Sequence, residues 1–281
     1  MTSIQPQPGD VTVNGVRLRY LDWGGDGDPI IVLHATGLLG RLYRPIAEAL
    51  TAAGHVFTYD QRGHGDSDAP LPVEQYNWTT TMNDLAGFIT AMNWRGVRAA
   101  GHSAGGTAIG SLASERPELI SRAVLIEPVL FEAVAGPVWG NPLYERTLKR
   151  RREFDSVEAM AANFDRRPPY DAWQKDLLRD YCAFGTRPAA DGKRTLKCSP
   201  EIEAHIYHTA RDFDGLGGLL RAEQPMLVIF GERGNLFGTD LVQKIARQLK
   251  SGRVITEPRG GHFLPMEQPE KVAQLALEFL R

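Results

Sequence analysis

The chain has 281 residues, of which 42% are hydrophobic and 23% are charged, and its formal net charge is −2. This composition is typical of a globular domain, and the balanced charge argues against nucleic acid or a membrane surface as a partner. Two cysteines, Cys182 and Cys198, are too few for a disulfide framework and favour a reducing compartment. The polar N-terminal residues show no signal-peptide pattern, and no apolar run is long enough to cross a bilayer. We therefore expect a cytoplasmic protein.

The first half of the chain alternates between apolar runs and helix-like segments. Residues Val11 to Asp22 alternate in hydrophobicity around Asn14-Gly15, a pair typical of a hairpin turn. A continuous apolar run, typical of a strand buried on both faces, follows at Ile30–Leu33, and further strands are predicted at Val56–Tyr59, Val97–Ala100 and Val124–Ile126. The intervening segments predict helices at Arg44–Ala53, Asn77–Met92 and Thr107–Ser114.

The pattern changes between Val129 and Glu223. This segment contains no apolar run of strand length and is expected to be helical, with many aromatic and charged residues. It includes the basic block Lys149 to Arg152, which predicts either a solvated helix face or a surface that attracts anionic substrates. The alternation then resumes, with strands expected at Met226–Phe230 and Arg253–Thr256 and helices at Asp240–Leu249 and Glu267–Leu280.

Strands that alternate with helices indicate an α/β protein with a mostly parallel sheet and helices on both faces. Ligands of such sheets bind beyond the carboxyl ends of the strands. The residues that follow the predicted strand ends include one glycine, Gly231, and five residues whose side chains can take part in chemistry. These five are His34, Asp60, Ser103, Glu127 and His262. Their convergence on one edge of the sheet predicts a site there.

The segment Gly101-His102-Ser103-Ala104-Gly105 reads as the end of a strand, a sharp turn and the start of a helix. A nucleophilic serine must stand clear of the backbone at the tip of such a turn, and the two glycines leave room for it. A helix that begins just after Ser103 places free N–H groups near the oxyanion that serine attack creates. The spacing therefore predicts that Ser103 is a nucleophile.

Together these segments resemble the α/β-hydrolase fold family, in its small, capped branch. The matching pieces are His34-Ala35-Thr36-Gly37, Asp60-x-Arg62-Gly63-x-Gly65-x-Ser67, Gly101-His102-Ser103-Ala104-Gly105 and Gly261-His262. The resemblance implies an eight-stranded, mostly parallel sheet with a helical lid inserted after the strand that ends at Ile126. It predicts a core domain formed by residues 1–128 and 224–281 and a helical cap formed by residues 129–223.

The resemblance also assigns roles around Ser103. His262 corresponds to the family's base, which takes the serine proton and later protonates the leaving group. The oxyanion is expected to bind the backbone N–H groups of Ala104 and Thr36, although Ala35 replaces the glycine that the family usually has before this second donor. Asp60 and Arg62 correspond to residues that pin their loop. Serine, where some members of this branch have aspartate, directs the chemistry toward acyl transfer.

The carboxylate that orients His262 is less clear from the sequence. The family usually places an aspartate after the seventh strand of the sheet, but this chain reads Gly231-Glu232-Arg233-Gly234. Glu127, at an alternative strand end that some members use, is favoured over Glu232 and Asp240. A structural role for Glu127 beside Pro128 is the remaining alternative.

Substrate contacts are predicted at His34, His102 and Trp139, and the aromatic residues of the cap are expected to form either an apolar pocket or the core of the cap. His34 and His64 also suit a role in bracing their loops. No pattern of metal ligands links the histidines, and no cofactor is expected. We expect a serine hydrolase of esters or lactones of a medium-sized, largely apolar small molecule. Carbon–carbon bond hydrolysis of a diketone-like acid, acyl transfer and a receptor without turnover are the alternatives; the oligomeric state is not predicted.

Overall fold

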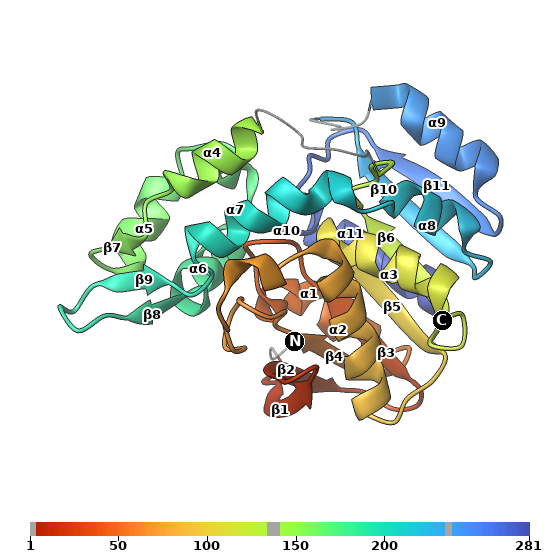
Figure 1. Cartoon of the computed structure of the whole chain (residues 1–281), viewed down its shortest axis with the longest axis horizontal. Helices are drawn as coiled ribbons and strands as arrows, with labels where there is room; N and C mark the ends of the chain where they lie inside the picture. The colour runs from red at the N-terminus through yellow and green to blue at the C-terminus, as the bar shows by residue number, and fades with distance from the viewer. Residues whose placement is uncertain (1–3, 134–140, 234–237) are drawn as a thin grey trace.

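A computed structural model describes residues 4–133, 141–233 and 238–281 of the chain (Figure 1). Its central feature is an eight-stranded sheet in the order β1-β2-β4-β3-β5-β6-β10-β11. The strands are β1 (Gln7–Val13), β2 (Val16–Gly24), β3 (Pro29–Leu33), β4 (His55–Tyr59), β5 (Val97–His102), β6 (Ile120–Ile126), β10 (Met226–Gly231) and β11 (Gly252–Glu257). The first two strands form the predicted hairpin, β2 pairs antiparallel with β4, and the remaining pairs are parallel. The predicted α/β architecture and strand number are confirmed.

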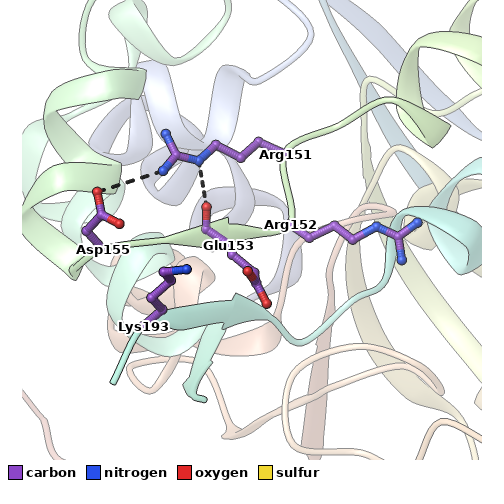
Figure 2. A pocket seen from close by; sticks show the side chains of 5 residues that line it. All are labelled: Arg151, Arg152, Glu153, Asp155 and Lys193. Atoms are coloured by element: carbon purple, nitrogen blue, oxygen red, sulfur yellow. Dashed lines mark hydrogen bonds and ion pairs between the residues drawn. The ribbon is translucent and has the colours of Figure 1, made fainter. Parts of the chain in front are cut away.

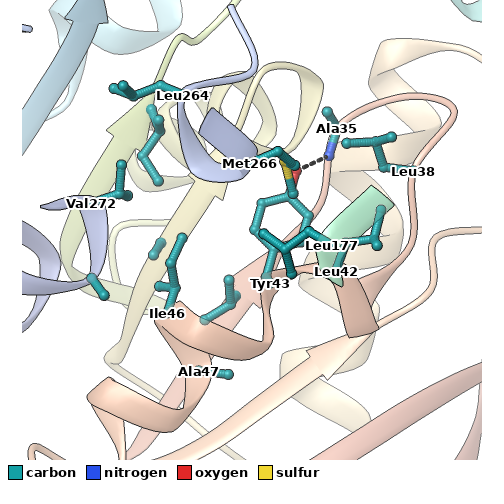
Figure 3. Packing of buried hydrophobic residues seen from close by; sticks show 14 of the residues in the cluster. Ala35, Leu38, Leu42, Tyr43, Ile46, Ala47, Leu177, Leu264, Met266 and Val272 are labelled. Carbon is teal, nitrogen blue, oxygen red and sulfur yellow. Dashed lines mark hydrogen bonds between the residues drawn. The ribbon is translucent and has the colours of Figure 1, made fainter. Parts of the chain in front are cut away.

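Helices cover both faces of this sheet, as expected from the alternation. They are α1 (Arg44–Leu50), α2 (Trp78–Ala91), α3 (Ala104–Glu115), α9 (Gly238–Gln248), α10 (Leu264–Glu267) and α11 (Pro269–Leu280), with the 3₁₀ turns η1 (Gly40–Tyr43) and η2 (Val73–Gln75). One buried cluster joins α1 and α11 to the sheet, and Figure 3 shows part of it around Tyr43. A second cluster joins α2, α3 and α9 to the opposite face. The predicted helix at Glu267–Leu280 is two helices, each of which has a proline in its first turn.

The segment between β6 and β10 folds mostly as short helices. They are α4 (Pro142–Leu148), α5 (Val157–Phe164), α6 (Lys175–Phe184), α7 (Pro200–His208) and α8 (Gly215–Arg221), with η3 (Tyr170–Ala172) and η4 (Thr209–Asp212). A small antiparallel sheet in the order β7-β9-β8 accompanies them, formed by β7 (Glu153–Phe154), β9 (Arg194–Leu196) and β8 (Thr186–Pro188). The sequence analysis missed these strands because two or three residues leave no readable apolar alternation.

The inserted segment does not stay at one end of the molecule. Helices α4 and α5 and the small sheet lie at the left of Figure 1, away from the large sheet. Helix α8, which falls within the predicted cap, instead packs beside α3, and its Leu216 and Leu219 belong to the same buried cluster as α3. Helix α7 lies between these regions, where Ile202 and Ile206 share a buried cluster with Ala104. The inserted segment is thereby anchored next to the start of α3.

Candidate active site

Ser103 stands at the sharp turn between β5 and α3. Its backbone has φ +53°, a conformation that residues other than glycine rarely adopt, and its N–H donates to the Ile126 carbonyl at 2.9 Å. A Cβ at Gly101 would lie 2.7 Å from the Gly105 backbone, and a Cβ at Gly105 would lie 2.6 Å from the carbonyl oxygens of Leu33 and His34. Both glycines are therefore required for the chain to turn at Ser103.

His262 connects Ser103 to a carboxylate. Its Nε2 lies 3.1 Å from Ser103 Oγ, and its Nδ1 lies 3.2 Å from Glu127 Oε2. Because a carboxylate accepts hydrogen bonds, Nδ1 carries the hydrogen toward Glu127, and Nε2 is left free to accept the Ser103 proton. The arrangement is that of a nucleophile, a base and a group that orients the base.

Glu127 reaches His262 from the end of β6. Its backbone has φ +48°, its side chain is 2% exposed, and its other carboxylate oxygen accepts the N–H of Gly231. The loop of His262 crosses close to this point, since a Cβ at Gly231 would lie 2.3 Å from the Gly260 carbonyl oxygen. Glycine at position 231 thus lets β10 end directly beneath the histidine loop.

The alternative carboxylates do not meet His262. Glu232 and Asp240 are both exposed, and no contact between either side chain and His262 exists in the described part of the chain. Gly234, where the resemblance places an aspartate, lies outside the described residues. Glu127 is thus the carboxylate that the structure brings to the histidine.

The loop after β3 offers one unoccupied N–H group. The N–H of Ala35 donates to Tyr43 Oη at 3.1 Å, and the N–H of Gly37 donates to His64 Nε2 at 2.9 Å. Between them, the N–H of Thr36 has no hydrogen-bond partner in the described residues. Ala104 opens α3, so its N–H has no partner within the helix. The N–H groups of Thr36 and Ala104, the two predicted oxyanion donors, therefore both lack a partner among the described residues.

Two of the predicted substrate contacts, His34 and His102, form hydrogen bonds within the protein. Both side chains are completely buried, and the protein itself occupies both ring nitrogens of each. His34 accepts from the Gln61 N–H at Nε2 and donates from Nδ1 to the Ala35 carbonyl. His102 contacts Tyr43 and the His262 carbonyl. The third predicted contact, Trp139, lies outside the described residues.

Burial also fixes the charge of these histidines. The pKa values of His34 and His102 lie well below the ordinary value, mainly because burial disfavours the charged ring. Burial also lowers the pKa of His64, which braces the loop by accepting from Gly37. All three are neutral structural groups at neutral pH.

Buried polar side chains also hold the loop after β4. Asp60 accepts the N–H groups of Gly40 and Asp66, and buried Arg62 pairs with Asp84 at 2.5 Å.

Two residues near His262 escaped the sequence analysis. Glu267 accepts the Gly261 N–H at 2.8 Å and so holds the histidine loop from α10. Tyr43 touches both Ala35 and His102. No motif marks either residue, and the contact of Tyr43 with His102 joins parts of the chain that are distant in sequence.

The basic block of the inserted segment divides into buried and exposed parts. Arg150 pairs with Glu203 at 2.5 Å and also donates to the hydroxyls of Tyr170 and Tyr181. Glu203 reaches the loop after β3, since a Cβ at Gly37 would lie 2.7 Å from its carboxylate. Arg151 and Arg152 instead line an open cavity of about 430 Å³ with Glu153, Asp155 and Lys193 (Figure 2). Neither Ser103 nor His262 lines that cavity.

The described residues contain neither a metal-binding cluster nor a membrane-spanning helix. No group of three or more histidine, cysteine, aspartate or glutamate side chains is placed to hold a metal ion. In the described part of the chain, no helix combines the length and apolar character needed to span a membrane.

The fold and this arrangement define an α/β protein with a serine–histidine–glutamate site at the carboxyl ends of its strands. Comparison with known proteins agrees: a sequence profile of the alpha/beta hydrolase family matches residues 30–275, and the chain belongs to that family. The chain is 26% identical to the AB hydrolase superfamily protein YfhM of Bacillus subtilis strain 168, with 96% of each chain covered. It is also 26% identical to a putative 2-succinyl-6-hydroxy-2,4-cyclohexadiene-1-carboxylate synthase of the same strain, covering 96% of this chain and 97% of that protein.

Solved structures extend the likeness to the fold. The crystal structure of E-2-(acetamidomethylene)succinate hydrolase superposes with a TM-score of 0.83 at 21% identity. The match covers 98% of this chain and 99% of that one.

Proposed function

We propose that this chain is a serine hydrolase that cleaves an ester or lactone of a medium-sized, largely apolar substrate through an acyl-enzyme. The observation that carries the proposal is the position of His262, whose two ring nitrogens face Ser103 Oγ and Glu127 Oε2. In this arrangement Nε2 can take the serine proton while Glu127 stabilises the imidazolium that forms.

The reaction proceeds in two halves. Ser103 Oγ attacks the substrate carbonyl carbon and passes its proton to His262 Nε2, and the N–H groups of Thr36 and Ala104 bind the resulting oxyanion. The C–O bond to the leaving alcohol then breaks, and His262 returns the proton to that oxygen. Water attacks the acyl-serine with His262 as base, which releases the carboxylic acid and restores Ser103.

The inserted segment supports an apolar substrate. Helix α7 packs Ile202 and Ile206 into the cluster that contains Ala104. Phe263 stands with its ring centroid 5.5 Å from that of His262 and 5.3 Å from that of Trp173. Apolar side chains thus pack against Ala104, which follows the nucleophile, and an aromatic ring stands beside the base, as expected for a site that binds by burial of apolar surface.

The proposal is tested with p-nitrophenyl esters of increasing acyl length and a set of lactones. We expect hydrolysis by the wild-type chain and a loss of about 10⁴-fold or more in kcat for Ser103→Ala. Ser111→Ala is a matched control, because Ser111 lies in α3, the helix that follows Ser103. Its hydroxyl is buried and has no partner among the described residues. A wild-type chain inactive on every ester and lactone, or a Ser103→Ala variant that keeps its activity, would contradict the proposal.

A further inference from the structure

His102, the residue that precedes the proposed nucleophile, has a fixed hydrogen-bonding pattern. Its Nε2 lies 2.7 Å from the carbonyl oxygen of His262, and its Nδ1 lies 2.6 Å from Tyr43 Oη. A carbonyl oxygen only accepts, so Nε2 must carry the ring hydrogen. Nδ1 is then without hydrogen in the neutral ring and accepts the Tyr43 O–H. One tautomer alone satisfies both contacts.

Tyr43 continues this pattern on its other side. Its hydroxyl oxygen accepts the N–H of Ala35 at 3.1 Å, and its ring is buried in the cluster that also contains Leu42, Leu177 and Met266 (Figure 3). Burial raises the pKa of the Tyr43 hydroxyl, and burial together with nearby His262 lowers the pKa of His102. Both groups therefore remain neutral, and the hydroxyl hydrogen stays available for His102.

The contacts form one continuous chain with a single direction. Ala35 N–H donates to Tyr43, Tyr43 O–H donates to His102, and His102 N–H donates to the His262 carbonyl. It joins the loop after β3, the turn at the end of β5 and the loop before α10. Thr36, with its free N–H, directly follows one end of the chain, and the His262 side chain is carried by the other end.

We propose that His102, held by Tyr43 as the neutral tautomer with hydrogen on Nε2, is a positioning residue that fixes the backbone of His262 relative to Ser103 and the Thr36 N–H. This inference rests on the proposed function, in which His262 is the base. Its physical reason is geometric, because a shift of about 1 Å in a catalytic group can cost about 10²-fold in rate. His102 itself touches neither the nucleophile's hydroxyl nor the substrate.

Tyr43→Phe tests the proposal, because it removes one oxygen and leaves the ring in place. Tyr59→Phe is the matched control: the Tyr59 hydroxyl is also buried, but it has no hydrogen-bond partner among the described residues. Both full-length variants and the wild type are produced with ¹⁵N-labelled histidine, and their ring nitrogens are observed by NMR at pH 7. The rate at which a fluorophosphonate probe modifies Ser103 is measured on each.

We expect the wild-type His102 to carry hydrogen on Nε2 alone. Tyr43→Phe should lower the rate of Ser103 modification by about 10- to 100-fold and shift the His262 Nδ1–H signal, whereas Tyr59→Phe stays within twofold. In ester hydrolysis we expect Tyr43→Phe to lower kcat and to leave KM within twofold of the wild-type value. A His102 ring with hydrogen on Nδ1, or a Tyr43→Phe variant within twofold of wild type, would overturn the proposal.

A second pair of variants acts on His102 directly. His102→Gln retains an N–H that can reach the His262 carbonyl, and His102→Leu retains none. We expect Gln to preserve at least about fivefold more Ser103 reactivity than Leu; equal rates in the two folded variants would contradict the positioning role. If the probe never modifies wild-type Ser103, the proposed function fails. The His262 Nδ1–H signal then decides this inference: a shift confined to Tyr43→Phe supports it, and an unchanged signal overturns it.

Discussion

Helix α3, beside the large sheet, and helices α4 and α5 of the inserted segment are held in place differently. In α3, ten consecutive residues from Ala104 to Ala113 are buried. In α4 and α5 of the inserted segment, only Thr147 and Met160 are buried. These short helices begin instead with side-chain caps, as at Asn141 and Ser156. Burial thus fixes α3 in the body, which is formed by the large sheet and its helices, while side-chain caps support α4 and α5.

This difference separates two tasks. The proposed nucleophile, base and carboxylate all stand on the body, at strand ends that tight packing holds in place. The inserted segment contributes side chains around them, including a buried ion pair and an aromatic cluster formed by Phe154, Phe164, Tyr170, Trp173 and Tyr181. We therefore expect changes in the body to alter the rate of the chemistry, and changes in the inserted segment to alter substrate choice or local stability.

Among variants that keep the proposed nucleophile, the largest effect is expected from Glu127→Gln. The amide keeps the volume but removes the charge that orients His262, and a comparable loss in a serine protease costs about 10⁴-fold in kcat. We expect a fall of roughly 10² to 10⁴ in kcat with KM little changed, measured by steady-state hydrolysis of p-nitrophenyl esters.

The controls are the two carboxylates that the sequence left open. Glu232→Gln and Asp240→Asn should each cost less than about tenfold, since both side chains are exposed. If Glu127→Gln kept nearly full activity while one of these variants lost most of its activity, the orienting carboxylate would lie after another strand.

A large loss of stability with the chemistry preserved is expected from Arg150→Gln. The Arg150 and Glu203 side chains are 17% and 8% exposed, so the change leaves a buried carboxylate without its partner. Breaking such a pair costs about 3–5 kcal/mol in the free energy of unfolding, which urea denaturation would measure. The folded fraction should keep the wild-type rate of Ser103 modification; a stability within about 0.5 kcal/mol of wild type would show that the pair contributes little.

A change in substrate choice is expected from Trp173→Phe. The Trp173 N–H has no partner in the described part of the chain, so the smaller ring costs little polar bonding while it opens space behind Phe263. We expect the ratio of kcat/KM between long and short acyl chains to rise by up to about tenfold. Trp94→Phe, which packs against Phe57 and Phe88, is the control and should leave the ratio unchanged. An identical profile in both variants would remove Trp173 from the specificity argument.

The smallest effect is expected at the open cavity of Figure 2. Arg151 and Arg152 are more than half exposed, and the carboxylates of Asp155 and Glu201 already face them. The double change Arg151→Gln and Arg152→Gln should leave hydrolysis of neutral and anionic esters within twofold and unfolding within about 0.5 kcal/mol. A selective loss with anionic esters would show that this surface attracts substrate.

The sequence predicted the body better than the inserted segment, and the reason is physical. Strands such as Ile30–Leu33 are buried on both faces and therefore leave continuous apolar runs. The strands β7, β8 and β9 are too short for any such pattern, and only their pairing in space defines them.

The same distinction applies within the site. Ser103 and His262 lie in short glycine-containing segments whose spacing is readable in the chain. The contact of Tyr43 with His102 joins parts of the chain that meet only after folding, so no local pattern marks it. The hydrogen bond of His34 with Gln61 could not be predicted for the same reason, because these residues are distant in sequence.

The most direct test of the central claim is the site and rate of modification by a fluorophosphonate probe, followed by mass spectrometry of the intact and digested protein. The claim is that Glu127 and His262 activate Ser103. It predicts a single modification on Ser103 in the wild type, none in Ser103→Ala, and a modification slowed by at least about 10²-fold in Glu127→Gln. Modification of a different residue, or a Glu127→Gln variant modified at the wild-type rate, would contradict it.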